Sequence, residues 1–267
     1  MSSAAVPTRS YTHRLSGSTD LPDRNLVGGK AWSLARMTSL GLRVPPAFVV
    51  TTEGFRHFHE AGELTEGLRA QVLDGLADLE RSTGRQFGVG PAPLLLSVRS
   101  GAAISMPGMM DTVLNLGMTD EVEAALANES GDATFARDTH HRFLELFNDV
   151  VLGLDPHDHR ADSPAAVRAS VSTARPDVAW DPLGQLMASI EAVFKSWNSR
   201  RARRYRAHQG ISDDLGTAVT VQAMVFGNLG EDSGTGVLFS RNPLDGSKQV
   251  YGEYLRRAQG EDVVSGR

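Results

Sequence analysis

The sequence predicts an α+β fold on three observations. Short runs of β-branched and apolar residues, typical of strands, alternate with longer stretches whose apolar residues recur every three or four positions, as on helices. Beyond about residue 119 the helical spacing continues without clear strands to about residue 197. Strand-like sequence then returns at residue 217. This pattern indicates a mixed fold with a largely helical segment in its middle.

Composition narrows the classes of function. The formal net charge is -5, which argues against nucleic acid as a general partner. No apolar run approaches the ~18 residues that a membrane helix needs, so we expect no membrane partner. The sequence has no cysteine, which excludes disulfides, thiol nucleophiles and cysteine-ligated metals. This composition fits a reducing compartment, and we expect a cytoplasmic protein.

Residues 1–20 are polar and aperiodic and predict a frayed leader or an edge strand. The first informative pattern comes after them. Gly28-Gly-Lys30 stands at the opening turn of a predicted helix that ends at Gly41. Backbone donors and the helix dipole favour an anion at such a turn. The spacing excludes a Walker A loop, and on its own the pattern fits a solvated lysine better than a binding site.

A strand over residues 48–52 and two helices continue the alternation. Thr51 or Thr52 is the predicted N-cap of a helix that passes through Phe55. Residues 64–80 carry leucines and a valine at helical spacing and predict the second helix. We interpret these elements as scaffold.

Arg99 stands where a predicted buried strand, the apolar run 94–96 and its continuation, would end. The loop that follows, as far as Thr112, holds two glycines, two serines, a proline and three methionines, which suits close approach of the backbone to a ligand. An arginine fork beside small residues is the arrangement that a phosphate chain requires. These residues alone support equally an anion-binding loop and a structural turn whose arginine pairs with a surface carboxylate.

Three helices are predicted in the middle of the chain, over residues 122–127, 135–151 and 182–194. The connection 155–181 is rich in Pro, Asp, Ala and Ser and predicts a weakly structured segment. The middle also holds four histidines, which we interpret as surface residues rather than metal ligands because no carboxylate frame accompanies them. They are His140, His141, His157 and His159.

The last third of the chain carries a basic run followed by strands. We interpret the basic run, residues 195–206, as a solvated helix face, because the chain is acidic overall and only one tyrosine interrupts the run. Residues 217–226 are the clearest strand, since β-branched residues alternate there with small or polar ones. A glycine-rich turn leads to a further predicted strand over residues 236–240.

Ser97-Val-Arg-Ser-Gly101, followed by Ser105-Met-Pro-Gly-Met-Met-Asp-Thr112, resembles the signature loop of the pyruvate, phosphate dikinases. The related phosphoenolpyruvate synthases share only the arginine-serine beginning. The resemblance implies an ATP-grasp nucleotide-binding domain in which the arginine contacts the phosphates of ATP. Gly28-Gly-Lys30 also resembles this family, whose lysine binds ATP phosphates, although Ala31 stands where the family usually has glycine.

The resemblance also implies the residues of the ATP site. Gln222, Met224 and Val225 on the strand 217–226 would hold adenine, with core packing as the alternative. Lys30, Arg99 and Arg241 would clamp the phosphates. Glu261 lies in a stretch that resembles the family's segment beside the nucleotide, and it would lie near the polyphosphate. The full set is Lys30, Arg99, Gln222, Met224, Val225, Arg241 and Glu261.

By the same resemblance the chain divides into a first ATP-grasp subdomain over residues 1–112, a helical insertion subdomain over 113–205, and a second, incomplete ATP-grasp subdomain over 206–267. In the family the second subdomain continues into strands that hold magnesium and carry an Asp-x-Glu-Phe pattern, which this sequence lacks. We therefore expect Mg²⁺ to accompany ATP, with its protein ligands beyond the C-terminus and no metal ligand within the chain.

The main hypothesis is the ATP-binding portion of a pyruvate, phosphate dikinase. This phosphotransferase converts ATP, phosphate and pyruvate to AMP, diphosphate and phosphoenolpyruvate through a phosphohistidine. Alone, the chain is expected to bind ATP weakly and not to complete the reaction. The alternatives are a non-catalytic nucleotide-binding module, a split-gene subunit whose partner chain carries the missing domains, and a related ATP-grasp phosphotransferase. A homodimer is also compatible with the sequence.

Overall fold

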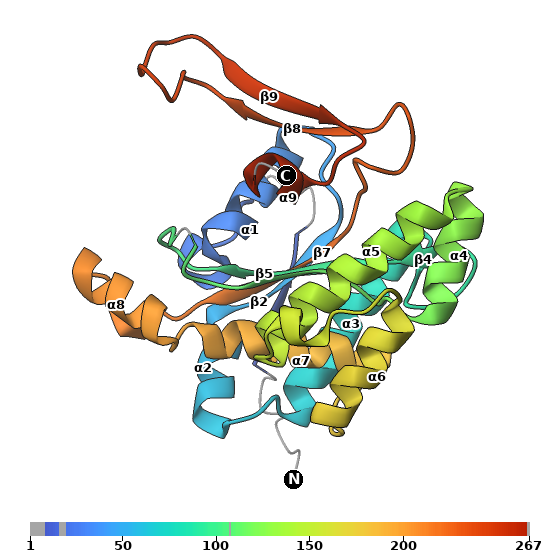
Figure 1. The fold of residues 1–267 in the computed structure, drawn as a ribbon. Coiled ribbons are helices and arrows are strands. Elements are labelled where there is room, and N and C mark those ends of the chain that lie inside the picture. The colour runs from blue at the N-terminus through green and yellow to red at the C-terminus, as the bar shows by residue number, and fades with distance from the viewer. Residues whose placement is uncertain (1–8, 16–19, 107, 266–267) are drawn as a thin grey trace.

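The computed structural model describes residues 9–15, 20–106 and 108–265 (Figure 1). Within this part the strands are β1 (Thr12–Arg14), β2 (Ala47–Val50), β3 (Gln86–Phe87), β4 (Pro93–Leu94), β5 (Leu96–Gly101), β6 (Thr112–Leu116), β7 (Ala218–Ala223), β8 (Gly234–Phe239) and β9 (Tyr251–Arg256). The α-helices are α1 (Arg24–Ser39), α2 (Thr52–Ala61), α3 (Glu66–Thr83), α4 (Asp120–Ser130), α5 (Ala133–Leu146), α6 (Pro164–Ala174), α7 (Pro182–Ser196), α8 (Arg200–Gln209) and α9 (Gly260–Ser265). A π-helical turn, Phe147–Val151, continues α5, and 3-10 turns cover Pro156–His159 and Asp213–Leu215. None of the described helices is long and apolar enough to cross a membrane.

Most elements predicted in the first hundred residues are confirmed. The Thr51 side chain caps α2 by accepting a hydrogen bond from the N–H of Gly54 at 3.3 Å. α1 begins earlier than predicted, at Arg24, and ends just before Gly41, which has a positive φ of 79°. Residues 12–14 form the edge strand β1, whereas residues 1–8 and 16–19 of the expected leader lie outside the described part.

Five antiparallel strands form the central sheet in the order β1-β2-β7-β5-β6. β7 lies between β2 and β5, which confirms the strand predicted within residues 217–226. All residues of β7 are buried, because helices cover both faces of the sheet. α1 lies on one face, and α2, α3 and α7 lie on the other (Figure 1).

The alternation of side chains along each strand decides which residues reach each face. Val98 of β5 and Val221 of β7 are paired, and both point into the main hydrophobic core with the apolar faces of α2, α3 and α7. The neighbouring pair, Arg99 and Thr220, therefore points to the opposite face, as does Gln222 two residues further along β7. The face that carries α1 thus also carries the polar side chains of the two central strands.

The connection 155–181 is more ordered than its composition indicates, and the expectation of weak structure is wrong. α6 lies inside it, with the Ser163 side chain as its N-cap and Pro164 as its first residue. Val167 and Val171, four residues apart, are buried in the main core. The serine-proline start and the valine spacing are helix signals that the overall composition hides.

The division of the chain into three parts stays a prediction. β6 begins at Thr112 and belongs to the central sheet, so the boundary predicted after residue 112 falls within that sheet. α7, from the middle part, packs on β5, β6 and β7, and its buried residues belong to the main core. The middle helices and the sheet therefore share one core.

The basic run forms the end of α7 and most of α8, but one of its arginines is not solvated. Arg206 is 1% exposed, and its guanidinium carbon lies 4.0 Å from the centre of the Trp197 ring. Its Nε donates to Oδ1 of Asp213 at 2.6 Å, and its Nη1 donates to the carbonyl oxygen of Trp197 at 2.5 Å. The expectation of a solvated face is therefore wrong for Arg206. It holds for Arg200, Arg203 and Arg204, which are exposed.

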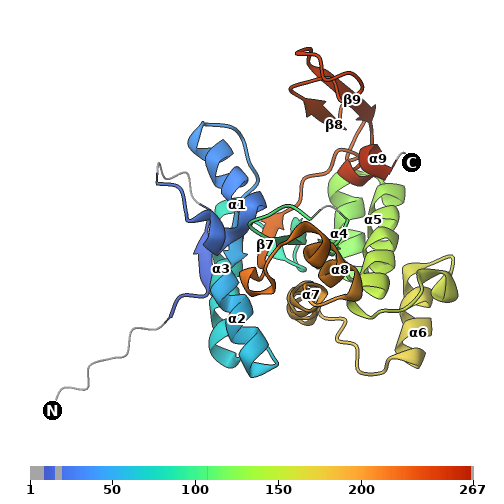
Figure 2. The ribbon, with the colours of Figure 1, turned by 90° about the vertical axis from the view of Figure 1, so that its left-hand side faces the viewer.

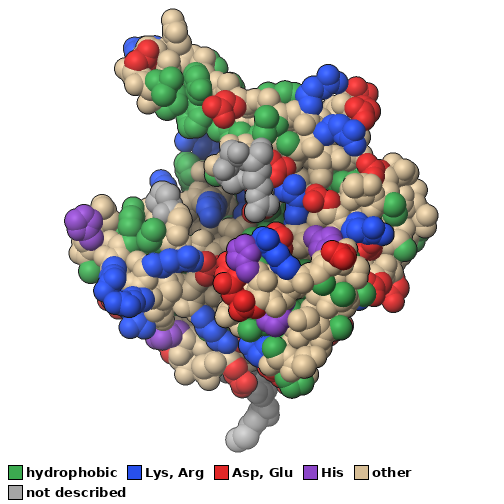
Figure 3. Space-filling model, viewed as in Figure 1, with side chains coloured by type: hydrophobic (Ala, Val, Ile, Leu, Met, Phe, Trp, Pro, Cys, Tyr) green, Lys and Arg blue, Asp and Glu red, His purple; other side chains and the backbone are tan. Residues whose placement is uncertain are grey.

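β8 and β9 form a separate antiparallel hairpin that stands away from the body of the molecule (Figure 2). β8 confirms the strand predicted at residues 236–240 in all but its last position. α9 follows the hairpin and contacts both of its strands. The surface beneath the hairpin is hollowed, and Lys and Arg side chains lie in the hollow (Figure 3).

Candidate functional site

Arg99 and Gln222 lie at the centre of the candidate site. Nη2 of Arg99 donates a hydrogen bond to Oε1 of Gln222, and Nε2 of Gln222 donates to the carbonyl oxygen of Pro45 at 2.9 Å. A neutral amide, rather than a carboxylate, therefore orients the guanidinium and leaves its charge uncompensated. Nε of Arg99 is buried and has no hydrogen-bond partner among the described residues.

Two glycines dock the start of α1 on the end of β5. α1 breaks at Gly28, where φ is 81° and ψ is 164°, a conformation that residues with a Cβ atom avoid. A Cβ atom there would lie 1.9 Å from the carbonyl oxygen of Gly101. The N–H of Gly29 donates to the carbonyl oxygen of Ala102 at 3.0 Å. Lys30 follows in the first turn after the break, which is the local setting that the sequence predicts for it.

The first of two adjoining pockets lies between α1 and the loop after β5, and we call it the loop pocket. Its volume is about 690 Å³, and its cationic lining residues are Arg24, Lys30 and Arg99. In the part of the chain that the structure describes, no aspartate or glutamate lines it. Burial, and then the charge of Arg99, lower the pKa of Lys30, and burial also lowers the pKa of Arg99. Burial of the charged Lys30 and Arg99 side chains costs free energy, and a bound anion would offset that cost.

The second pocket, which we call the strand-end pocket, lies at the end of β7 and has a volume of about 950 Å³. Much of its lining is apolar, including Leu42 and the exposed Val225. Arg99 and Thr112 line both pockets, so the two cavities meet at the end of β5. The arrangement suits an elongated ligand with an apolar ring system at one end and a polyanion at the other.

α9 closes one side of the strand-end pocket and is anchored to α5. Nη1 of Arg142 donates to Oδ1 of Asp262 at 2.7 Å, and both side chains are largely buried. Oδ2 of Asp262 accepts from the N–H of Gln259 at 2.8 Å, which fixes the first turn of the helix. This anchor holds Glu261 in the lining of the strand-end pocket.

A comparison with known proteins shows the family of the chain. The family model of the pyruvate phosphate dikinase AMP/ATP-binding domain matches residues 24–80 and 67–267. The chain belongs to this family. The match includes every residue of the two pockets that is named above.

Curated relatives are pyruvate, phosphate dikinases. That of Rhizobium meliloti (strain 1021) is 47% identical over 269 residues, which cover 91% of this chain and 30% of the relative. Pyruvate, phosphate dikinase 2 of Zea mays is 48% identical with the same coverage of both chains. The chloroplastic pyruvate, phosphate dikinase 1 of Arabidopsis thaliana is 47% identical, and 28% of it is covered. The chain therefore spans about 30% of the length of these relatives.

The structure brings together most of the residues that the dikinase resemblance implies. Lys30 and Arg99 share the loop pocket, whereas Met224, Val225 and Glu261 line the strand-end pocket. The N–H of Met224 already donates to the carbonyl oxygen of Leu95 at 2.9 Å, so it is not available to a base. Of the remaining two candidates, Gln222 also lines the strand-end pocket, whereas Arg241 lines neither pocket.

Gln222 lies on the side that the resemblance implies for adenine, but its side-chain amide already bonds Arg99 and the carbonyl oxygen of Pro45. Arg241 lies in the connection at the far end of the β8–β9 hairpin, where it is exposed and lines neither pocket. Its Nη1 donates to the carbonyl oxygen of Gly246 at 3.3 Å. The structure therefore does not bring Arg241 together with Lys30 and Arg99.

Sequence reasoning missed two residues of the site. Arg24 lines the loop pocket, and Gln259 lines the strand-end pocket with a buried side-chain amide that has no partner among the described residues. Neither residue lies in a sequence motif that indicates a particular chemistry. The glutamine stands two positions before Glu261, and that adjacency was the available signal.

One histidine is not the surface residue that the sequence indicates. His140 is fully buried, and its Nδ1 hydrogen-bonds Oε2 of Glu123 at 2.7 Å. Its ligand atoms lie within 4.8 Å of those of Glu123 and Asp120, close enough to share a metal ion. However, Arg168 donates to Asp120 and places Nη1 3.5 Å from Nε2 of His140. The arginine supplies the positive charge there, and burial, as the largest effect, lowers the pKa of His140.

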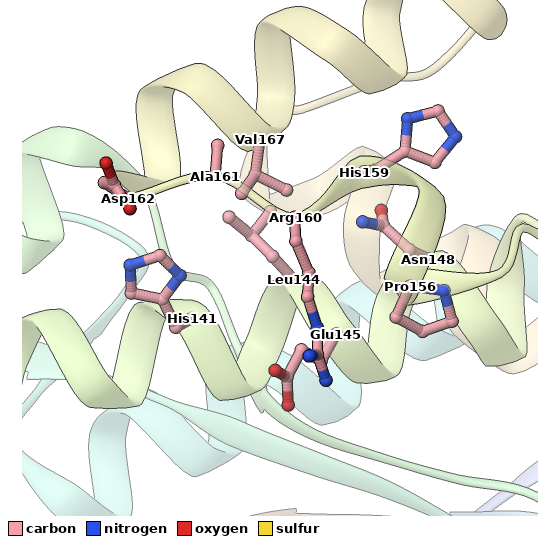
Figure 4. A pocket seen from close by; sticks show the side chains of 10 residues that line it. All are labelled: His141, Leu144, Glu145, Asn148, Pro156, His159, Arg160, Ala161, Asp162 and Val167. Carbon is pink, nitrogen blue, oxygen red and sulfur yellow. The ribbon is translucent and has the colours of Figure 1, made fainter.

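A separate cavity of about 320 Å³ lies between α5 and α6, with His141 and His159 on opposite sides of it (Figure 4). Glu145, Asn148 and Arg160 also line it. It shares no lining residue with the loop pocket or the strand-end pocket. We therefore do not include it in the candidate site.

Proposed function

We propose that the chain binds ATP, with the base in the strand-end pocket and the phosphates in the loop pocket. The observation that carries this proposal is the position of Arg99, which lines both cavities and offers an uncompensated charge where they meet. The membership of the AMP/ATP-binding domain family supports the same ligand. Backbone groups at Val225 would bind the edge of the base, because the Met224 N–H is already bonded.

The other candidate residues would contact the phosphates and the ribose of ATP. Lys30 and Arg99 would bind the phosphates by charge-assisted hydrogen bonds. Glu261 lines the strand-end pocket and not the loop pocket, so a role toward the ribose hydroxyls suits it better than contact with the polyphosphate. Gln222 would orient Arg99 rather than touch the base.

We further propose that this ATP-grasp site serves the reaction of a pyruvate, phosphate dikinase, with phosphate and pyruvate as the other substrates and phosphoenolpyruvate as a product. The sequence identity to enzymes of that name supports this part of the proposal. Because the chain spans about 30% of their length, the later steps would depend on further polypeptide, in the same chain or in a partner chain. The same observation favours, as a second candidate, a nucleotide-binding module that acts within a larger assembly.

The described residues that line the two pockets do not form a magnesium site of their own. Mg²⁺ prefers carboxylate oxygens, but no described lining residue of the loop pocket is acidic, and among those of the strand-end pocket only Glu261 is. Magnesium would therefore come with the phosphates of ATP and meet cationic walls.

Calorimetric titrations with ATP, adenosine and tripolyphosphate test whether both pockets contribute. ATP should bind more tightly than either fragment, because each fragment fills only one pocket. If ATP bound no more tightly than tripolyphosphate, the strand-end pocket would not be a nucleoside pocket. If none of the three bound, the proposed function would be wrong.

A further inference from the structure

We propose that Arg24 is a third phosphate-binding cation, which takes the phosphate group farthest from the base. The inference rests on the proposed ATP binding and adds a residue and a position to it. Arg24 lines the loop pocket together with Lys30 and Arg99, but it does not line the strand-end pocket. It therefore lies on the side of the phosphate chain that is remote from the nucleoside.

The Arg24 guanidinium is close to the turn that presents Lys30. A Cβ atom built on Gly29 would lie 3.4 Å from Nη2 of Arg24. The guanidinium carbon lies 5.7 Å from the centre of the Trp32 ring, and among the described residues no carboxylate pairs with it. A ring face holds a cation without neutralising it, so Arg24 remains able to bind an anion.

The position of Arg24 in α1 does not serve the helix itself. Arg24 is the first residue of α1, and the first turn contains no acidic residue. The turn before the break at Gly28 is too short to carry the dipole of a full helix, so Arg24 gains no favourable helix-dipole interaction there. A role toward an anionic ligand in the adjoining pocket accounts for a cation at this position.

Arg36 provides a matched control within the same helix. Its guanidinium carbon lies 5.5 Å from the centre of the same Trp32 ring, but it lines neither the loop pocket nor the strand-end pocket. Replacement of either arginine by alanine removes one cation from the Trp32 ring. Only the replacement of Arg24 removes a cation from the loop pocket.

The test is a set of calorimetric titrations with ATP, ADP and AMP, on the unmodified chain and on Arg24→Ala, Arg24→Lys and Arg36→Ala. Loss of a charge-assisted contact should weaken ATP binding by Arg24→Ala about tenfold or more. AMP binding should be unchanged, ADP should lose less than ATP, and Arg24→Lys should retain part of the affinity. Arg36→Ala should bind all three nucleotides as the unmodified chain does.

Two results would overturn the inference while leaving ATP binding in place. One is unchanged affinity of Arg24→Ala for ATP, in a protein whose affinity does fall on Arg99→Ala. The other is an equal loss of affinity for AMP and ATP, which would indicate a general effect on the fold. Absence of ATP binding by the unmodified chain would instead refute the proposed function and this inference together.

Discussion

Arg99 donates a hydrogen bond to Gln222, whose amide in turn donates to the carbonyl oxygen of Pro45 at 2.9 Å. This relay connects β5, β7 and the segment before β2 on the face of the sheet that carries α1. Gln222 is 5% exposed, so water competes little for its hydrogen bonds. The direction of the Arg99 guanidinium is therefore set before any ligand arrives, which lowers the entropic cost of binding.

Replacement of Gln222 by leucine should weaken ATP binding about tenfold, because Arg99 loses the acceptor that orients it. Gln71→Leu is the matched control. Gln71, like Gln222, makes a hydrogen bond at each end of its amide, accepting from the N–H of Tyr11 at 2.6 Å and donating to the carbonyl oxygen of Arg9 at 3.0 Å, but it lies outside both pockets. Calorimetry should show unchanged ATP affinity for this control. Equal losses in the two variants would contradict a specific role for Gln222.

Gly28→Ala should lower the free energy of unfolding by about 3 kcal/mol, because it combines an unfavourable backbone conformation with a clash against Gly101. Gly41→Ala should cost only about 1 kcal/mol, since Gly41 has a similar φ of 79° but nothing within 4 Å of its Cβ position. Urea unfolding measures both values. A cost for Gly28→Ala no larger than for Gly41→Ala would show that the docking of α1 on β5 does not require glycine.

ATP affinity should fall with rising pH before an ordinary lysine, with a pKa of about 10.4, begins to lose its proton. Burial and the charge of Arg99 lower the pKa of Lys30, and a bound polyphosphate would raise it again. Binding should therefore take up a proton at pH values between the pKa of Lys30 in the free protein and its pKa in the complex. Calorimetry in two buffers of different ionisation enthalpy, between about pH 7 and pH 10, measures this uptake.

Lys30→Arg is the control for the pH dependence, since arginine stays charged throughout this range. This variant should show neither the proton uptake nor the decline in affinity. The same decline in both proteins would assign the pH dependence to another group.

The sequence predicted those parts of the fold that depend on local patterns. β7 follows from alternating β-branched residues, and the N-cap at Thr51 follows from a threonine ahead of apolar residues at helical spacing. α6 was missed because a composition rich in Pro, Asp, Ala and Ser outweighed the spacing of Val167 and Val171. Arg206 was misjudged because its partner, the Trp197 ring, lies on the preceding turn of the chain and no helical period connects the two.

The site was less predictable, because it depends on which segments the fold brings together. The sequence does not reveal that Gln222 is paired with Ser97 across the sheet, and this register is what directs its amide to Arg99. The sequence places both Arg99 and Arg241 at the ends of predicted strands, yet Arg99 lies within β5 of the central sheet and Arg241 follows β8 of a separate hairpin. Arg24 lies before the break of α1 at Gly28 and lines the loop pocket, and no sequence motif marks this position.

The most direct test of the ATP site is a calorimetric titration of ATP into the unmodified chain and into Arg99→Ala, with unfolding midpoints measured for both. We predict binding by the unmodified chain and an affinity at least about tenfold lower for Arg99→Ala, since the variant loses the cation that lies where the two pockets meet. The unfolding midpoints should remain similar, because Arg99 carries an uncompensated charge that contributes little to stability. Equal affinities of the two proteins for ATP would contradict the assignment of the site.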